Sequence, residues 1–154
     1  NPWRGYISIA VGFTAITVLH IVVGGDYGYR YRLGAQGIHP FNSWFGELPG
    51  TLGMVSGTGE APSGIVAYQS DNLPAEYRGD LLCTSWGVHA IERYRLTRRG
   101  ASFSSVPETI VRGDQQFRPV GIALAPDGSL YISDWVDRAY SISEKIRKAV
   151  LACS

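Results

Sequence analysis

Side chains able to carry out chemistry gather in two short stretches of this sequence, one ending at His89 and one around residues 134–138. Histidine changes its protonation near neutral pH, so His89 is a candidate catalytic base. The alternative is a corner residue hydrogen-bonded to backbone. Asp134 and Asp137 carry the oxygen ligands that calcium prefers, although such acids also cap turns. The residue types therefore point to proton transfer and metal binding.

The rest of the sequence lacks several familiar kinds of site. It has no glycine-rich phosphate loop, no Gly-x-Ser-x-Gly nucleophile motif and no His-Glu-x-x-His motif. Cys83 and Cys153 lie outside any Cys-x-x-Cys pattern, which predicts packing thiols. The formal net charge of +1 gives no electrostatic reason to expect nucleic acid as a partner.

Two similar segments position these residues. "APSGIVAY" at 61–68 matches "RPVGIALA" at 118–125, and "GDLLCTSW" at 79–86 matches "GSLYISDW" at 128–135. The offsets, 57 and 49 residues, differ by an eight-residue insertion in the first copy. The Pro, Asn and Asp content of the inserted "SDNLPAEYRGD" predicts a surface loop. A period of roughly fifty residues with several short strands is typical of β-propeller blades.

We therefore predict an all-β fold: a partial, open β-propeller of about two to three blades of four-stranded antiparallel sheet, with a short C-terminal helix. The expected strands lie at about 64–69, 80–86, 88–97 and 102–112, followed by 119–125 and 129–135. The single domain, 1–154, is expected to comprise strands of an incomplete blade (1–33), a long loop (34–60), a complete blade (61–113), a partial blade (114–140) and a helical tail (141–154).

In a meandering sheet, the first strand begins and the second strand ends at the same rim. The approach to each first strand is therefore expected beside the corner that follows each second strand. The residues expected to converge are Glu60, Trp86, His89, Arg118, Asp134, Trp135, Asp137 and Arg138. Structural alternatives are an ion pair between Arg118 and Asp134 and packing of both tryptophans between blades.

Two further stretches bear on the fold. Residues 5–23 carry no charge, and a run of that length could cross a bilayer as a membrane helix or signal anchor. Their many β-branched residues favour two adjacent strands bent at Gly12 instead. In residues 26–33, tyrosines alternate with Arg30 and Arg32, which predicts an aromatic ladder on one strand face and arginines on the other.

Several long runs resemble a known family. They are "GGDYGYRYRLG", "HPFNSWFGELPGT", "GTGEAPSGIVAYQSDNLPAEYRGDLLCTSWGVHAIERYRL", "RGASFSS" and "FRPVGIALAPDGSLYISDWVDRAY". Together, over about residues 16–140, they resemble the propeller of the bacterial membrane-bound dehydrogenase family, which is similar to sorbosone and soluble glucose dehydrogenases.

This resemblance implies a six-bladed propeller, export to the periplasm or cell envelope, and oxidation of a sugar or alcohol with pyrroloquinoline quinone (PQQ) and calcium. It also implies a cytochrome c domain or protein as a partner, although this chain has no haem motif and its tail at 141–154 departs from the family pattern. In those enzymes a histidine acts as base near the quinone and an arginine contacts it, which implies His89 as the base. The implied cofactor contacts are Arg118, Trp86, Trp135 and Arg30, and the implied calcium ligands are Asp134 and Asp137.

Two functions follow as hypotheses. The first is a fragment of a quinoprotein-type sugar or alcohol dehydrogenase propeller that is inactive alone. The alternative is a non-catalytic propeller module that recognises a glycan or a protein through the tryptophans and arginines of the rim. The sequence leaves membrane association open.

Overall fold

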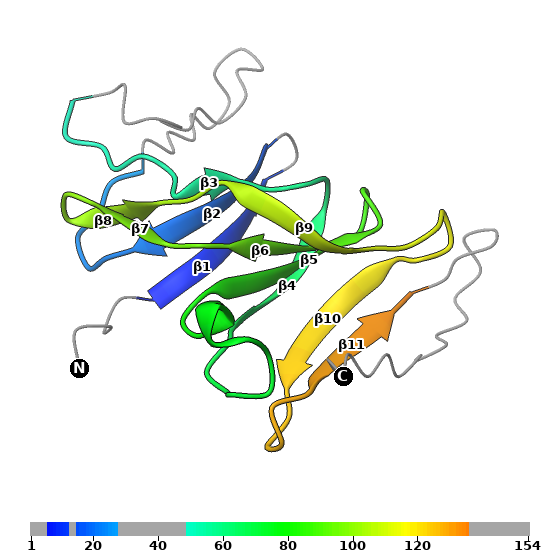
Figure 1. Cartoon of the computed structure of the whole chain (residues 1–154). Coiled ribbons are helices and arrows are strands. Elements are labelled where there is room, and N and C mark those ends of the chain that lie inside the picture. Colours follow the sequence, from blue (N-terminus) through cyan, green and yellow to red (C-terminus); the bar gives the residue numbers. More distant parts are fainter. Residues whose placement is uncertain (1–5, 13–14, 28–48, 136–154) are drawn as a thin grey trace, which may run out of the picture.

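The computed structural model describes residues 6–12, 15–27 and 49–135, and these residues form four antiparallel sheets (Figure 1). In the N-terminal sheet, β1 (Tyr6–Gly12) and β2 (Ala15–Ile21) pair along their whole length, and β3 (Ser56–Gly57) adds to β2. Residues 5–23 therefore contain two adjacent strands, as their β-branched composition predicts. Within the described ranges, no helix is long and apolar enough to cross a membrane.

The central sheet has four strands in the order β4 (Pro62–Ala67), β5 (Leu81–Ser85), β6 (Ala90–Tyr94) and β9 (Pro107–Arg112). The insertion between β4 and β5 is a loop with one 3-10 turn, η1 (Ala75–Tyr77). The prediction of one strand over 102–112 is wrong, because β7 (Thr97–Arg99) and β8 (Ser102–Ser104) form a separate hairpin. Gly100 adopts a φ of 59°, and this left-handed conformation permits the tight turn that removes residues 97–104 from the central sheet.

The last sheet is a hairpin of two strands, β10 (Pro119–Leu124) and β11 (Leu130–Asp134). It has the same local geometry as β4 and β5, since the register of both pairs shifts at a bulge just before a glycine. A hydroxyl on the neighbouring strand satisfies the glycine N–H in each case. Gly64 N donates to Thr84 Oγ1 at 2.8 Å, and Gly121 N donates to Ser133 Oγ at 2.8 Å. The two segments matched in the sequence thus share register and bulge.

Two hydrophobic clusters hold the sheets side by side. The first joins the N-terminal sheet to the central sheet and consists of Val18, Val55, Leu81, Cys83 and Tyr94. The second joins the central sheet to β10 and β11 and centres on Tyr68, Leu82 and Leu130. Strand β5 contributes alternate residues to both clusters, so both of its faces are buried. The described residues form an all-β, open, partial propeller, as predicted; the helix expected at 141–154 lies outside them.

Arg93 anchors the insertion loop to the middle of β6. The residue is only 1% exposed, and its Nε pairs with Asp80 Oδ2 at 2.6 Å. Its Nη2 donates to Glu76 O, and its guanidinium lies 3.7 Å from the centroid of the Tyr77 ring. Glu108 on β9 adds a longer contact of 3.9 Å. The buried cation is therefore matched by a carboxylate, a carbonyl and an aromatic face.

Tyr68 links the same loop to the next hairpin. It is fully buried, and its hydroxyl donates to Gly128 O at 3.1 Å and accepts from Leu73 N at 2.8 Å. Gly128 belongs to the Pro-Asp-Gly turn between β10 and β11, where it adopts a φ of 84°. One side chain thus joins the insertion of the first segment to the turn of the second.

We expect Tyr68→Phe to lower the free energy of unfolding by about 1–3 kcal/mol, because two backbone groups lose a buried hydrogen-bond partner while the ring packing stays. Urea denaturation followed by tryptophan fluorescence measures this change. Tyr77→Phe is the matched control, since its ring stacks on Arg93 and its hydroxyl makes no hydrogen bond within the described residues. Equal losses in the two variants would contradict the role given to the Tyr68 hydroxyl.

A buried group of ionisable side chains lies on the face of the central sheet that meets the N-terminal sheet. Glu92 is 6% exposed, and its Oε2 accepts hydrogen bonds from Gly59 N at 2.9 Å and from the Tyr94 hydroxyl at 2.6 Å. Cys83 is its cross-strand partner. Burial, followed by the charge of Glu92, raises the pKa of the Cys83 thiol from 9.0 to about 12. Burial and the hydrogen bond to Glu92 also raise the pKa of Tyr94.

These shifts predict a loss of stability at alkaline pH. A group whose pKa is higher in the folded state keeps its proton there, so the contribution of Cys83 is complete below pH 9 and is lost as the pH rises toward about 12. One such group changes the free energy of unfolding by at most about 1.4 kcal/mol per pH unit. We expect Cys83→Ala to flatten this slope, measured by urea denaturation at several pH values above 9. An unchanged slope would show that the thiol does not titrate there.

Candidate functional site at the strand rim

One rim of the sheets lies where β4 and β10 begin and where β5 and β11 end. One further backbone hydrogen bond continues each strand pair beyond its last paired residues. Trp86 N donates to Ala61 O at 3.1 Å, and Trp135 N donates to Arg118 O at 2.8 Å. We use the term rim for residues 60–61, 85–89, 117–118 and 134–135. The rim contains these predicted site residues: Glu60, Trp86, His89, Arg118, Asp134 and Trp135.

Arg118 stacks on Trp86 and does not pair with Asp134. The guanidinium carbon lies 4.2 Å from the centroid of the indole ring, and Nη1 donates to Trp86 O at 3.1 Å. The expected side-chain ion pair with Asp134 is absent among the described residues, because the Asp134 carboxylate instead accepts the backbone N–H of Arg118 at 2.6 Å. Most of the guanidinium donors therefore remain available, and the buried Trp86 Nε1 has no hydrogen-bond partner among the described residues.

His89 is held so that one ring nitrogen stays available. Its Nδ1 lies 2.9 Å from Phe117 O, and a carbonyl oxygen can only accept a hydrogen bond. Nδ1 therefore carries the proton in neutral His89, which makes Nε2 the basic nitrogen. The backbone is fixed as well, since Gly113 N donates to His89 O at 2.9 Å. This arrangement has the form required of a general base.

Backbone strain is concentrated at the rim. Among the described residues, the two non-glycine residues with positive φ are Ala61, at 51°, and His89, at 57°. Such conformations cost roughly 1–3 kcal/mol and cluster at functional sites. Gly87 is required for the same close packing, because a Cβ there would lie 2.5 Å from Glu60 Cβ. The sheet corners therefore hold Ala61 and His89 in strained backbone conformations, and Glu60 packs closely against Gly87.

The loop that delivers Phe117 and Arg118 to the rim has its own local determinants. Asp114 Oδ1 accepts the N–H groups of Gln116 at 2.8 Å and of Phe117 at 3.2 Å. A Cβ at Gly113 would overlap Phe117 Cβ, so only glycine admits this ring. Arg118 was among the predicted site residues, whereas Phe117, whose carbonyl sets the tautomer of His89, was not. The available signal was the Asp in "GDQQF", which is typical of an Asx turn.

The remaining predicted site residues are either exposed at the rim or lie outside the described residues. Trp135 is 45% exposed, and Arg30, Asp137 and Arg138 lie outside the described residues. No group of three or more His, Cys, Asp or Glu side chains that could hold a metal ion occurs in the described part of the chain. Asp134 is buried and already bonds the N–H of Arg118, so it acts there as a cap. Because Asp137 lies outside the described residues, the calcium site expected at Asp134 and Asp137 stays a prediction.

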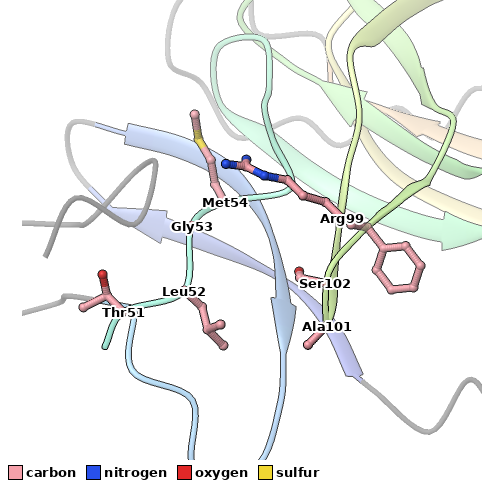
Figure 2. Close-up of a pocket in the computed structure, with 8 residues that line it drawn as sticks. Thr51, Leu52, Gly53, Met54, Arg99, Ala101 and Ser102 are labelled. Atoms are coloured by element: carbon pink, nitrogen blue, oxygen red, sulfur yellow. The ribbon is translucent and has the colours of Figure 1, made fainter. Parts of the chain in front are cut away.

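A separate pocket of about 230 Å³ lies between residues 51–54 and the β7–β8 hairpin (Figure 2). Its walls consist of Thr51, Leu52, Gly53, Met54, Arg99, Ala101, Ser102 and Phe103. None of these residues belongs to the rim. Since β6 begins beside His89 and ends before the hairpin, the pocket and the rim lie beyond opposite ends of this strand (Figure 1).

Solved structures with a similar fold are glucose dehydrogenases. One from Thermus thermophilus is 22% identical with a TM-score of 0.60, and two further glucose dehydrogenase structures give 25% and 22% identity with TM-scores of 0.59 and 0.60. Each similarity covers 87% of this chain, and the chain spans 36–39% of the length of those proteins. These similarities establish a glucose dehydrogenase-like fold.

Sequence comparisons place the chain in a family. A search of curated proteins found no match. The family model described as "Domain of unknown function (DUF7133)" matches residues 35–150, which includes the central sheet, the rim and the β10–β11 hairpin. Because the match covers most of the sequence, the chain belongs to the DUF7133 family.

Proposed function

We propose that the chain is part of the propeller of a quinoprotein-type sugar or alcohol dehydrogenase and is inactive by itself. The observation that carries the proposal is the rim, where a histidine with an available Nε2 lies beside an arginine without a carboxylate partner among the described residues. A fold similar to glucose dehydrogenases supports it. We further propose that the two matched hairpins are equivalent parts of successive blades of a longer repeat.

The charge of Arg118 supports PQQ as the cofactor of the rim. PQQ is planar and carries carboxylates, and a guanidinium fork binds carboxylates with two parallel hydrogen bonds. Arg118 would hold such a carboxylate, and Trp86, on whose ring the guanidinium stacks, would keep the arginine in position. When bound, the quinone would take up the electrons released by the substrate. Calcium at Asp134 and Asp137 stays part of the proposal, and no catalytic step is assigned to it.

His89 would remove the proton of the substrate hydroxyl group. Its Nε2 accepts that proton, and the Phe117 carbonyl stabilises the resulting imidazolium through Nδ1–H. The contact of Nδ1 with Phe117 O and the backbone bond from Gly113 N keep the ring in place before substrate arrives. A positioned base of this kind contributes about 10²- to 10⁴-fold to the rate.

The test uses the full-length protein that contains this chain, loaded with PQQ and calcium. PQQ binding is followed by the change in its absorbance, and activity by dye reduction with aldoses and simple alcohols. We expect His89→Gln to keep PQQ binding and lower kcat by about 10²-fold or more. We expect Arg118→Gln to weaken PQQ binding at least tenfold. A full-length protein that does not bind PQQ would overturn the proposal.

The alternative is a non-catalytic module that binds a glycan or protein. The observation in its favour is Trp135, a large aromatic side chain that is 45% exposed beside Arg118. Exposed tryptophans at a rim are suited to stacking on sugar rings or partner side chains. Glycan-array binding that is lost in Trp135→Ala, in a protein that does not bind PQQ, would favour this alternative.

Location and redox partner are part of the same proposal. We propose that the full-length protein acts in the periplasm or cell envelope and passes electrons to a cytochrome c domain or protein. Cell fractionation and reduction of a c-type cytochrome by the loaded protein test the two parts separately.

A further inference from the structure

We infer that the pocket between residues 51–54 and the β7–β8 hairpin binds a small organic anion with an apolar body. This site is independent of the rim and of the function proposed for it. One side of the pocket presents a cation, and four of its eight lining residues supply apolar side chains. Such a combination selects a carboxylate attached to a compact hydrocarbon group.

The pocket has walls fixed by backbone hydrogen bonds. Leu52 N donates to Asp26 O at 2.7 Å, and Val55 N donates to Val18 O at 2.9 Å, so residues 51–55 are tied to the N-terminal sheet. Ser105 N donates to Val55 O at 2.9 Å, which ties the end of the hairpin to the same segment. Both walls of the pocket are therefore anchored, and the space between them is a property of the fold.

Arg99 supplies the charge. It lies opposite Ser102 in the hairpin, and both residues line the pocket. Figure 2 shows its guanidinium extending across the pocket toward Met54. Two arginines of the central sheet and its edge have carboxylate partners: Arg93 with Asp80 at 2.6 Å and Arg95 with Glu108 at 3.3 Å. Arg99 has none among the described residues, so its donors are available to a ligand.

The apolar walls and the volume define the rest of the ligand. Leu52, Met54, Ala101 and Phe103 provide hydrocarbon and aromatic surface. The Phe103 ring is itself held by an edge-on contact with the His20 ring, with centroids 5.1 Å apart. A volume of about 230 Å³ equals roughly eight water volumes, which suits a small aromatic or branched carboxylate.

Met54 allows a direct test, because it is the only methionine in the sequence. With a ¹³C-labelled methionine methyl group, the chain gives one methyl NMR signal, and that signal reports on the pocket. We expect sodium benzoate to shift it saturably, with a Kd of about 1–10 mM, which is ordinary for so small a ligand. Benzamide has the same shape without the charge, and we expect it to bind at least tenfold more weakly.

Two variants that lose the same charge distinguish binding in the pocket from a general electrostatic effect of the protein surface. Arg99→Gln should weaken benzoate binding at least tenfold. Arg98→Gln should change it less than twofold, because adjacent strand residues point to opposite faces. Three results would each overturn the inference. They are no shift of the signal with about 50 mM benzoate, which is well above the expected Kd, equal binding of benzamide and benzoate, and equal effects of the two variants. Backbone amide spectra of both variants verify that the fold is kept.

Discussion

Replacing Arg93 with methionine is expected to lower the free energy of unfolding by about 3–5 kcal/mol. The methionine fills a similar volume, but the Asp80 carboxylate, whose side chain is only 13% exposed, loses its partner at 2.6 Å. An unpaired carboxylate in this position must be desolvated without compensation. The carbonyl of Glu76 also loses its donor, and the Tyr77 ring loses its cation. Urea denaturation of the variant, followed by fluorescence, measures the loss.

The same substitution at Arg78 is the control. Arg78 also pairs with an aspartate at 2.6 Å, Asp71, but the two side chains are 58% and 82% exposed. Exposed pairs of this kind contribute little, so Arg78→Met should change the free energy of unfolding by less than about 1 kcal/mol. In a double variant, Asp80→Asn should recover part of the loss from Arg93→Met. Similar losses from the two arginine variants would contradict the importance of burial.

Replacing Gly64 with alanine is expected to lower the free energy of unfolding by about 2–3 kcal/mol. A Cβ at this position would lie 2.8 Å from Val120 O, 3.0 Å from Ile122 N and 3.2 Å from Gly121 Cα. These are backbone atoms of β10, which cannot rotate away as a side chain can. The two sheets must therefore separate, and the hydrogen bond from Thr84 Oγ1 to Val120 O, 2.9 Å long, is weakened as well.

Gly57→Ala provides the comparison for this prediction. Gly57 also lies in a strand, its φ is not positive, and a Cβ there would meet nothing within 4 Å. Alanine in place of glycine at such a site restricts the unfolded chain, so the free energy of unfolding should stay equal or rise by up to about 1 kcal/mol. Thermal and urea denaturation of both variants check the pair. A Gly64→Ala variant as stable as Gly57→Ala would show that β4 and β10 do not approach closely.

Much of the fold was predictable from local patterns. The hairpins β4–β5 and β10–β11 follow from apolar runs bounded by turn residues, and the Pro-Asp-Gly turn uses the positive φ of Gly128. The error at 102–112 arose because a strand-forming stretch does not reveal its partner. Residues 102–104 pair with their neighbours 97–99, and only residues 107–112 join the central sheet.

Burial in the central sheet was less predictable. In "AIERY", strand β6 carries two adjacent charged residues, Glu92 and Arg93, and both are buried. Because neighbouring residues point to opposite faces, each needs its own partners. Glu92 finds them in Gly59 and Tyr94, and Arg93 in Asp80. A charged pair in the middle of a strand that has neighbours on both sides is the signal that points to such internal partners.

The candidate site, too, could be predicted only in part from the sequence. Paired strands alternate in direction, and their ends therefore bring His89 and Arg118 to one rim. The sequence by itself determined this proximity. Where the Arg118 side chain goes was decided only by the tertiary structure. Trp86, on whose ring it stacks, is 32 residues away, and Asp134 is already engaged by a backbone N–H. Strand pairing and turns depend on neighbours along the chain, whereas side-chain partners and the pocket beside Arg99 depend on how separate sheets pack.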